Sequence, residues 1–289
     1  MKKLIIFLLS IFAVLFCTAC NNTESSINFT DYENGREIYN ITSVKLPYNL
    51  DKKCSSYSFD YDVDGVSVEG YISIPNDCDE NNPYKCILYN RGGNVNMGHL
   101  QDTDTARICA ETDRIVIASQ YRKNDEFGGE DLNDVLKLID LCEGFGFTDM
   151  TDFTVAGVSR GGMMSYMTAR ADSRIKRIIS ISGVSDLSSA YYDRDDMKRL
   201  LNNFIGGNPE DFPDEYEKRS ATCWADEITI PVLIIHSTGD QQVNYSQAEE
   251  MYNALLKNGA DVTMKTYNDS THGLHKDDIK VISQWLSEN

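Results

Sequence analysis

The sequence predicts an α/β fold organised around one doubly wound, mostly parallel sheet, and three observations support that prediction. Short apolar runs rich in Ile and Val alternate with longer segments of helical period from Lys85 onward. These runs are apolar at almost every position, as expected for parallel strands that are covered on both faces. No repeat, low-complexity block or long linker divides residues 40–289, so a single domain is expected to contain them.

The individual elements follow from these runs. An N-terminal antiparallel hairpin is expected over residues 56–63 and 66–74, because Asp64-Gly65 between alternating apolar residues is a strong hairpin signal. The parallel strands are expected at residues 86–89, 115–118, 153–156, 178–181, 232–235 and 262–267. Candidate helices lie at residues 131–142, directly after Ser159, at 245–256 and at 277–286. Strands that alternate with helices imply right-handed crossovers and one doubly wound sheet.

Residues 188–229 interrupt this alternation. The segment carries many charges together with Tyr191, Tyr192 and Trp224, and it is expected to form several short helices. An insertion at this point of the fold either caps a pocket or forms a surface excursion, and the sequence leaves both interpretations open.

Residues 1–19 are expected to be a signal peptide rather than part of the fold. Two lysines precede an apolar run over residues 4–16, which is too short to cross about 30 Å of hydrocarbon as a helix. The sequence Cys17-Thr18-Ala19-Cys20 resembles a bacterial lipobox, which implies that Cys20 is lipidated and becomes the mature N-terminus. Ordinary secretion after Ala19 is the alternative.

The polar segment that follows is expected to connect this lipid to the folded part. Residues 20–40 form the predicted tether, and residues 41–289 form the predicted α/β domain. On this interpretation the protein is exported and lies at the cell surface or in the periplasm of a bacterium as a membrane-anchored lipoprotein. Contact with the membrane is expected only through the lipid anchor.

Charge and residue spacing argue against nucleic-acid and metal-binding functions. The chain carries 45 Asp and Glu against 27 Lys and Arg, a formal net charge of −18, and such a surface repels phosphate backbones. The Cys17-x-x-Cys20 pair lies in the signal segment without a second pair, and no His/Cys/Asp cluster has the spacing of metal ligands. No Gly-x-Gly-x-x-Gly follows a strand, so neither a metal nor an organic cofactor is expected.

The segment Gly157-Val158-Ser159-Arg160-Gly161 matches the Gly-x-Ser-x-Gly pattern of a nucleophile elbow. In this turn the chain reverses sharply from strand into helix and holds the serine in a strained conformation, and the two glycines are needed because the flanking residues crowd each other. The pattern follows the predicted strand 153–156 and opens a helical segment, which is the structural context that the motif requires. Ser159 is therefore the candidate nucleophile, and a glycine-rich structural turn is the alternative.

A serine hydroxyl is a weak nucleophile at neutral pH, so Ser159 needs a neighbouring base. The chain has four histidines, and the base in such an arrangement comes from a loop after the last strand. His272 fits that position, and Gly273 leaves room for its ring to approach the elbow. His275 is expected on the first turn of the closing helix instead, and His236 is expected to be a packed, hydrogen-bonded histidine.

A third group must hold the imidazole tautomer and stabilise its charged form. Asp240 lies directly after the predicted strand 232–235, and the order Ser159, Asp240, His272 is the chain order of α/β-hydrolases. Asp186 is the competitor. It follows an earlier strand than the acid normally uses, so a structural role is expected for it.

The oxyanion of a tetrahedral intermediate needs amide donors in its vicinity. One is expected from the backbone N–H of Arg160, the residue after the candidate nucleophile. The other is expected from the loop at residues 89–94, where paired glycines let the backbone approach a developing charge without a Cβ. Gly93 is the first choice for this donor, and Gly92 is the second.

With these pieces in place, the chain resembles the catalytic domain of the prolyl oligopeptidase family of serine peptidases from about Tyr71 to the C-terminus. The resemblance is carried by YNRGGN at 89–94, QYRKNDEFGGEDLNDV at 120–135, AGVSRGGMMSY at 156–166, PVLIIHSTGD at 231–240 and STHG at 270–273. It implies an α/β-hydrolase fold. Two departures stand out: too few residues precede this region to form the β-propeller of the full-length peptidases, and the loop has Arg-Gly-Gly-Asn where many members have His-Gly-Gly-Pro.

The resemblance implies a serine hydrolase with a small-molecule or short-peptide substrate, and three functions remain open. The first is a serine-type peptidase that cleaves short peptides. The second is a carboxylesterase acting on small or carbohydrate-linked esters, as some propeller-less relatives are; it shares acyl transfer to Ser159 and differs in the leaving group. The third is a surface lipoprotein that binds a ligand without turnover, and the intact set of Ser159, Asp240 and His272 argues against it.

Overall fold

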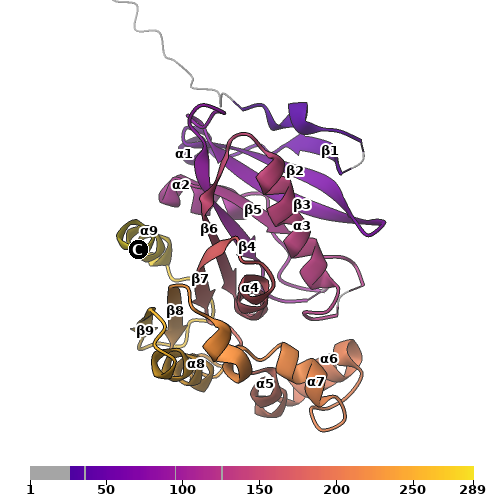
Figure 1. The fold of residues 1–289 in the computed structure, drawn as a ribbon, viewed down its shortest axis with the longest axis vertical. Helices are drawn as coiled ribbons and strands as arrows, with labels where there is room; N and C mark the ends of the chain where they lie inside the picture. The colour runs from indigo at the N-terminus through magenta and orange to yellow at the C-terminus, as the bar shows by residue number, and fades with distance from the viewer. Residues whose placement is uncertain (1–26, 36, 95, 125) are drawn as a thin grey trace, which may run out of the picture.

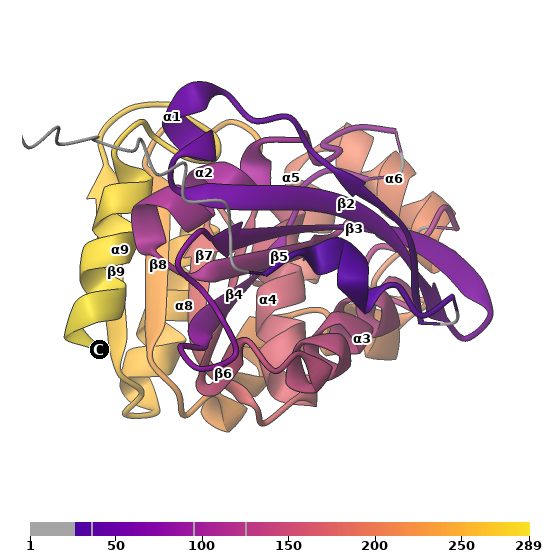
Figure 2. The same ribbon diagram turned by 90° about the horizontal axis from the view of Figure 1, so that it is seen from above.

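The computed structural model describes residues 27–35, 37–94, 96–124 and 126–289, which form one nine-stranded sheet with helices on both faces (Figure 1 and Figure 2). The strand order is β1-β2-β3-β5-β4-β6-β7-β8-β9. The first three strands pair antiparallel and β4 to β9 pair parallel with one another. The prediction of a mostly parallel sheet with an N-terminal antiparallel hairpin is confirmed.

The antiparallel part of the sheet consists of β1 (Ile38–Ser43), β2 (Cys54–Val63) and β3 (Val66–Pro75). Asp64 and Gly65, both with positive φ, form the tight turn between β2 and β3 that their sequence predicts. The parallel part consists of β4 (Tyr84–Asn90), β5 (Ile115–Ser119), β6 (Thr148–Val158), β7 (Ile175–Ile181), β8 (Val232–Ser237) and β9 (Val262–Tyr267).

Five longer helices cover the two faces of the parallel strands. One face is covered by α2 (Asp104–Thr112) and α9 (Asp278–Glu288), and the other by α3 (Asp131–Gly144), α4 (Arg160–Ala171) and α8 (Ser246–Lys257). Successive strand residues pack on opposite faces, so that Ile87 contacts the core under α2 and α9 while Leu88 contacts the core on the other side. Burial of both faces explains why the parallel strands are apolar at nearly every position.

Shorter helices lie outside these layers. Near the N-terminus they are η1 (Phe29–Tyr32) and α1 (Tyr48–Asp51). The insertion after β7 forms α5 (Leu187–Asp193), α6 (Asp195–Ile205), α7 (Pro213–Lys218) and η2 (Ala221–Glu227). Figure 1 shows α5, α6 and α7 grouped at the end of the molecule opposite to β1.

The predicted tether is too long at its C-terminal end. Phe29 is fully buried and packs edge-on against Phe145, with 5.4 Å between ring centroids, and β1 begins within the range expected to be a tether. The folded part therefore includes residues from Ile27 onward, because these aromatic side chains complete the core beside α3. The predicted signal peptide and Cys20 lie outside the described residues. Within the described part of the chain, no helix is long and apolar enough to cross a membrane.

Candidate active site

Ser159 lies in the sharp turn between the end of β6 and the start of α4. Its backbone has φ 58° and ψ −121°, a conformation that residues with a Cβ rarely adopt. The flanking glycines make the turn possible, since a Cβ on Gly157 would overlap the carbonyl oxygen of Gly161, and a Cβ on Gly161 would overlap that of Asn90. The turn thus has the crowding that the Gly-x-Ser-x-Gly pattern predicts, and it holds Ser159 at the carboxyl edge of the sheet.

Asp240 lies in the loop after β8 and is surrounded by hydrogen-bond donors. Its Oδ1 accepts from the backbone N–H groups of Gln242 (2.8 Å) and Val243 (3.1 Å). Its Oδ2 lies 2.8 Å from Nδ1 of His272 and 3.5 Å from Nε2 of His236. Burial by itself raises the pKa of Asp240, but the hydrogen bonds from the two histidines and the two amides outweigh it, so the pKa lies below its usual range. Asp240 is therefore an anion placed to orient the His272 ring.

His272 and Ser159 line the same cavity. His272 follows β9 in a loop that is tied to the sheet, because the backbone N–H of Gly273 donates to Ser182 Oγ at 3.1 Å. Gly273 has φ 93°, and a Cβ there would lie 3.4 Å from the Val158 side chain, directly before the nucleophile. Within the described residues Ser159 and His272 make no hydrogen bond with each other; such bonds are often long without substrate and tighten in the complex. The structure thus joins His272 to Asp240 and brings Ser159 to the same cavity.

His275 has a structural position. Its ring stacks on Tyr267, with 3.8 Å between ring centroids, and its two nitrogens lie within 3.2 Å of the carboxylates of Asp269 and Asp278. The prediction that His275 lies on the first turn of the closing helix is wrong, because α9 begins only at Asp278.

The other two alternatives also serve the fold. His236 is buried at the end of β8, where its Nε2 lies 3.0 Å from the carbonyl oxygen of Val243. Asp186 caps α5, because its carboxylate accepts a hydrogen bond from the backbone N–H of Ser189 at 2.9 Å. The structure places Asp240, and not Asp186, against the His272 ring.

The loop after β4 lies against the nucleophile. A Cβ on Gly92 would lie 3.3 Å from the Cβ of Ser159, so a side chain at this position would crowd the site. Gly93 has φ 72°, a conformation that favours glycine. The backbone N–H groups of Gly92 and Gly93 make no hydrogen bond to any described residue, and Arg160 is the first residue of α4, where backbone N–H groups point away from the helix. These N–H groups are the candidate oxyanion donors.

The cavity over Ser159 has a volume of about 470 Å³ and is lined by parts of the chain that the sequence did not connect. The insertion contributes Ala190 from α5 and Met197 and Leu200 from α6. This arrangement supports the interpretation of the insertion as a cap. Phe127, which has positive φ, lines the opposite wall and stacks on Phe204 of α6 with 6.3 Å between ring centroids. The sequence signal for Phe127 is the Gly-Gly pair that follows it, which indicates a tight turn but not its place beside the nucleophile.

The described residues contain no group of three or more His, Cys, Asp or Glu side chains that could hold a metal ion. The chemistry of the site is therefore derived from its hydroxyl, imidazole, carboxylate and backbone groups.

Comparison with known proteins gives a family match and several relatives. The sequence profile of the prolyl oligopeptidase family matches residues 117–288, a range that contains Ser159, Asp240 and His272. The chain is 27% identical over 241 residues to the uncharacterised peptidase YtmA of Bacillus subtilis (strain 168), and the match covers 80% of this chain and 92% of that protein.

Solved structures of peptidases and esterases have the same fold. The acylaminoacyl peptidase of Pyrococcus horikoshii superposes with a TM-score of 0.70 at 18% identity, over 81% of this chain and 42% of that one. The acetyl xylan esterase from Paenibacillus sp. R4 superposes with a TM-score of 0.68 at 15% identity, over 90% of both chains. The expectation of an α/β-hydrolase fold is thereby confirmed.

Proposed function

The chain belongs to the prolyl oligopeptidase family and is a serine hydrolase, and on that premise we propose that it is a serine peptidase that cleaves short peptides by acyl transfer to Ser159. One observation carries this proposal. The 2.8 Å contact between Asp240 and His272 orients an imidazole toward a cavity that also contains a serine held in a strained elbow.

The reaction proceeds in two steps. In the first, Ser159 Oγ attacks the substrate carbonyl carbon, and His272 accepts the hydroxyl proton and passes it to the leaving amine as the C–N bond breaks. In the second, water takes the place of the amine, gives a proton to His272 and releases the acid product and the free hydroxyl. Asp240 stays ionised throughout and stabilises the charged imidazole, while the N–H groups of Arg160 and Gly93 stabilise the oxyanion.

The cavity supports a short substrate with an apolar group beside the scissile bond. A volume of about 470 Å³ is within the usual range for small-molecule sites. Much of its wall is apolar, formed by Phe127, Val184, Met197, Leu200 and Val243. We therefore expect aminoacyl substrates with large apolar side chains to react faster than those with acidic ones.

A fluorophosphonate probe tests the nucleophile directly. Wild-type protein should be labelled, and Ser159→Ala should not be. Absence of labelling in the wild-type protein would support instead a ligand-binding protein without turnover. Equal labelling of both proteins would show that another residue is the nucleophile.

A carboxylesterase is the second candidate, and one observation favours it. The acetyl xylan esterase matches over 90% of its own length, whereas the acylaminoacyl peptidase matches over only 42%, so the chain has the domain size of the esterase. Rates on p-nitrophenyl acetate, acetylated xylo-oligosaccharides and a series of aminoacyl p-nitroanilides separate the two activities. Turnover of the esters without the anilides would replace the peptidase proposal by the esterase.

We further propose that the enzyme is exported and anchored by a lipid on Cys20. The sequence before residue 21 supports this, and only residues 21–26 separate Cys20 from the folded part that begins at Ile27. Radiolabelled palmitate should be incorporated into the wild-type chain and not into Cys20→Ala. Secretion of an unlabelled wild-type chain cut after Ala19 would contradict the anchor.

A further inference from the structure

Two buried arginines hold the loop that carries the candidate oxyanion donors, and we propose that the side chains of Arg91 and Arg160 are positioning residues for the N–H of Gly93. The inference rests on the proposed function, because it concerns the tetrahedral intermediate formed on Ser159. Neither side chain is needed to touch the substrate for this role. Each acts through the backbone of the loop.

Arg91 fixes the peptide group that contains the Gly93 N–H. Its Nη1 donates to the carbonyl oxygens of Gly92 at 3.0 Å and Asn94 at 3.2 Å, while Nε and Nη2 donate to the carbonyl oxygen of Gln120 at 2.9 and 2.7 Å. The peptide group between Gly92 and Gly93 is planar and trans, so its C=O and N–H point in opposite directions. A guanidinium that holds the Gly92 carbonyl therefore also sets the direction of the Gly93 N–H.

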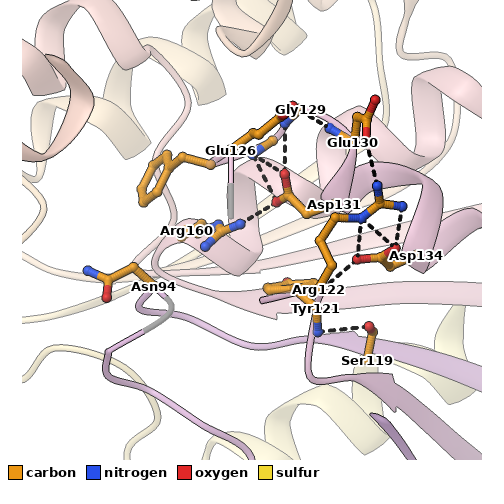
Figure 3. A network of polar contacts seen from close by, with 12 residues as sticks. Asn94, Ser119, Tyr121, Arg122, Glu126, Gly129, Glu130, Asp131, Asp134 and Arg160 are labelled. Carbon is orange, nitrogen blue, oxygen red and sulfur yellow. Dashed lines mark hydrogen bonds and ion pairs between the residues drawn. The ribbon is translucent and has the colours of Figure 1, made fainter. Parts of the chain in front are cut away.

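Arg160 holds the next peptide group of the same loop. Its Nη1 donates to the carbonyl oxygen of Gly93 at 3.2 Å, and its Nη2 forms an ion pair with Asp131 at the start of α3. Asp131 is itself fixed, because its carboxylate accepts hydrogen bonds from the backbone N–H groups of Gly128 and Gly129, as Figure 3 shows for Gly129. Arg160 thus supplies one proposed oxyanion donor from its backbone and positions the other donor through its side chain.

Tyr121 links the two arginines. The guanidinium carbons of Arg91 and Arg160 lie 4.7 and 4.8 Å from the centroid of its ring. The Tyr121 hydroxyl donates to the backbone carbonyl of Arg91 at 3.2 Å. Both cations are therefore held by an aromatic ring and by carbonyl oxygens, which fixes their positions more closely than a single ion pair would. Two positive charges beside the loop also favour a developing oxyanion.

A matched control lies on the same helix. Arg122 forms a buried ion pair with Asp134 of α3 at 2.8 Å and a second with Glu130 at 2.6 Å, and Figure 3 shows these pairs beside that of Arg160 with Asp131. Arg122 is 5% exposed, against 3% for Arg91 and 1% for Arg160. The described contacts of the Arg122 side chain do not include the loop of Gly92 and Gly93. Replacement of Arg122 therefore reports the cost of disturbing a buried arginine without moving the proposed donors.

The experiment compares Arg91→Lys, Arg160→Lys and Arg122→Lys in the full chain. Lysine keeps the charge and the backbone N–H but loses the planar fork that reaches two acceptors at once. The readouts are kcat and KM on p-nitrophenyl acetate, the dissociation constant of a trifluoromethyl ketone, whose adduct with Ser159 carries an oxyanion, and the melting temperature.

We expect Arg91→Lys and Arg160→Lys to lower kcat about 10- to 100-fold with little change in KM, since loss of one oxyanion donor costs about 10² to 10³. The trifluoromethyl ketone should bind more weakly by a similar factor. Arg122→Lys should lower the melting temperature as much as the other two and leave kcat within about twofold. If Arg160→Lys does not fold, Asp131→Asn makes the same test, because its amide oxygen still accepts from Gly128 and Gly129.

Two outcomes would overturn the inference in distinguishable ways. Equal kcat and equal ketone affinity in all three variants, with an active wild-type protein, would refute the positioning role and leave the proposed function standing. A wild-type protein that neither turns over any substrate nor binds the ketone would refute the proposed function, and the inference with it.

Discussion

The backbone strain at Ser159 predicts that the nucleophile can be replaced by a more stable residue. At φ 58° and ψ −121° a residue with a Cβ is held in a sparsely populated region, at a cost of about 1 to 3 kcal/mol. Ser159→Gly removes this strain, and about 0.5 to 1 kcal/mol of the gain is lost because glycine has more freedom in the unfolded chain. The Ser159 hydroxyl makes no hydrogen bond to a described residue, so its removal leaves no partner without a bond. The expected net gain is about 0.5 to 2 kcal/mol.

The matched control is Ser159→Ala, which removes the hydroxyl but keeps the strained Cβ. Urea unfolding of the two inactive variants should give the same slope and a higher midpoint for Ser159→Gly. In thermal unfolding the difference should be about 1 to 4 °C, since 1 kcal/mol shifts the melting temperature of a large domain by roughly 2 °C. A Ser159→Gly variant that is no more stable than Ser159→Ala would refute the argument, because it would show that the elbow stores no strain.

Three further predictions follow from the site and its surroundings. His272→Ala should lower kcat by at least about 10⁴-fold at nearly wild-type stability, whereas His275→Ala should keep the rate and lower the melting temperature; a dead His275→Ala variant would reverse the assignment. Because the pKa of Asp240 is lower in the folded than in the unfolded chain, its ionised form stabilises the fold fully above about pH 3.9, the unfolded value, and this contribution is lost as the pH falls through the folded pKa. The stability gap between wild type and Asp240→Asn in urea should therefore be largest at neutral pH and shrink below about pH 4, and a gap independent of pH would contradict this. Gly161→Ala should cost at least about 1 to 3 kcal/mol in urea unfolding because its Cβ would overlap a backbone carbonyl, while the control Gly144→Ala, whose Cβ would meet open space, should be neutral or slightly stabilising.

The central sheet could be predicted from the sequence because its strands are buried on both faces, but two peripheral elements could not. β1 is an edge strand with mostly exposed residues and a register shift between Tyr39 and Thr42, so its apolar alternation is weak. The buried face of α2 includes Thr105, Ala106 and Thr112, which are too small or polar to produce a helical hydrophobic pattern. The same weakness led to the predicted tether being drawn across β1.

The candidate site divides in the same way. Ser159, Asp240 and Gly93 follow strands directly, and the carboxyl ends of parallel strands meet at one edge, so local sequence was enough to place them together. The cavity walls depend on how the insertion folds back over that edge, which no local pattern specifies; Met197 and Phe127 became visible only in the structure. The roles proposed for Ser159, Asp240 and His272 stay predictions until the variants are measured.

The position of Phe29 has a consequence for how the enzyme meets its substrates. The described chain begins beside this residue, at the end of the molecule that lies opposite α5, α6 and α7 (Figure 1). A molecule held to a bilayer, a bead or a fusion partner through its N-terminus would therefore stand with the insertion helices outermost. Long polymers or the ends of large proteins would approach that outer face without colliding with the support, and immobilisation through residue 27 should leave turnover of bulky substrates unimpaired.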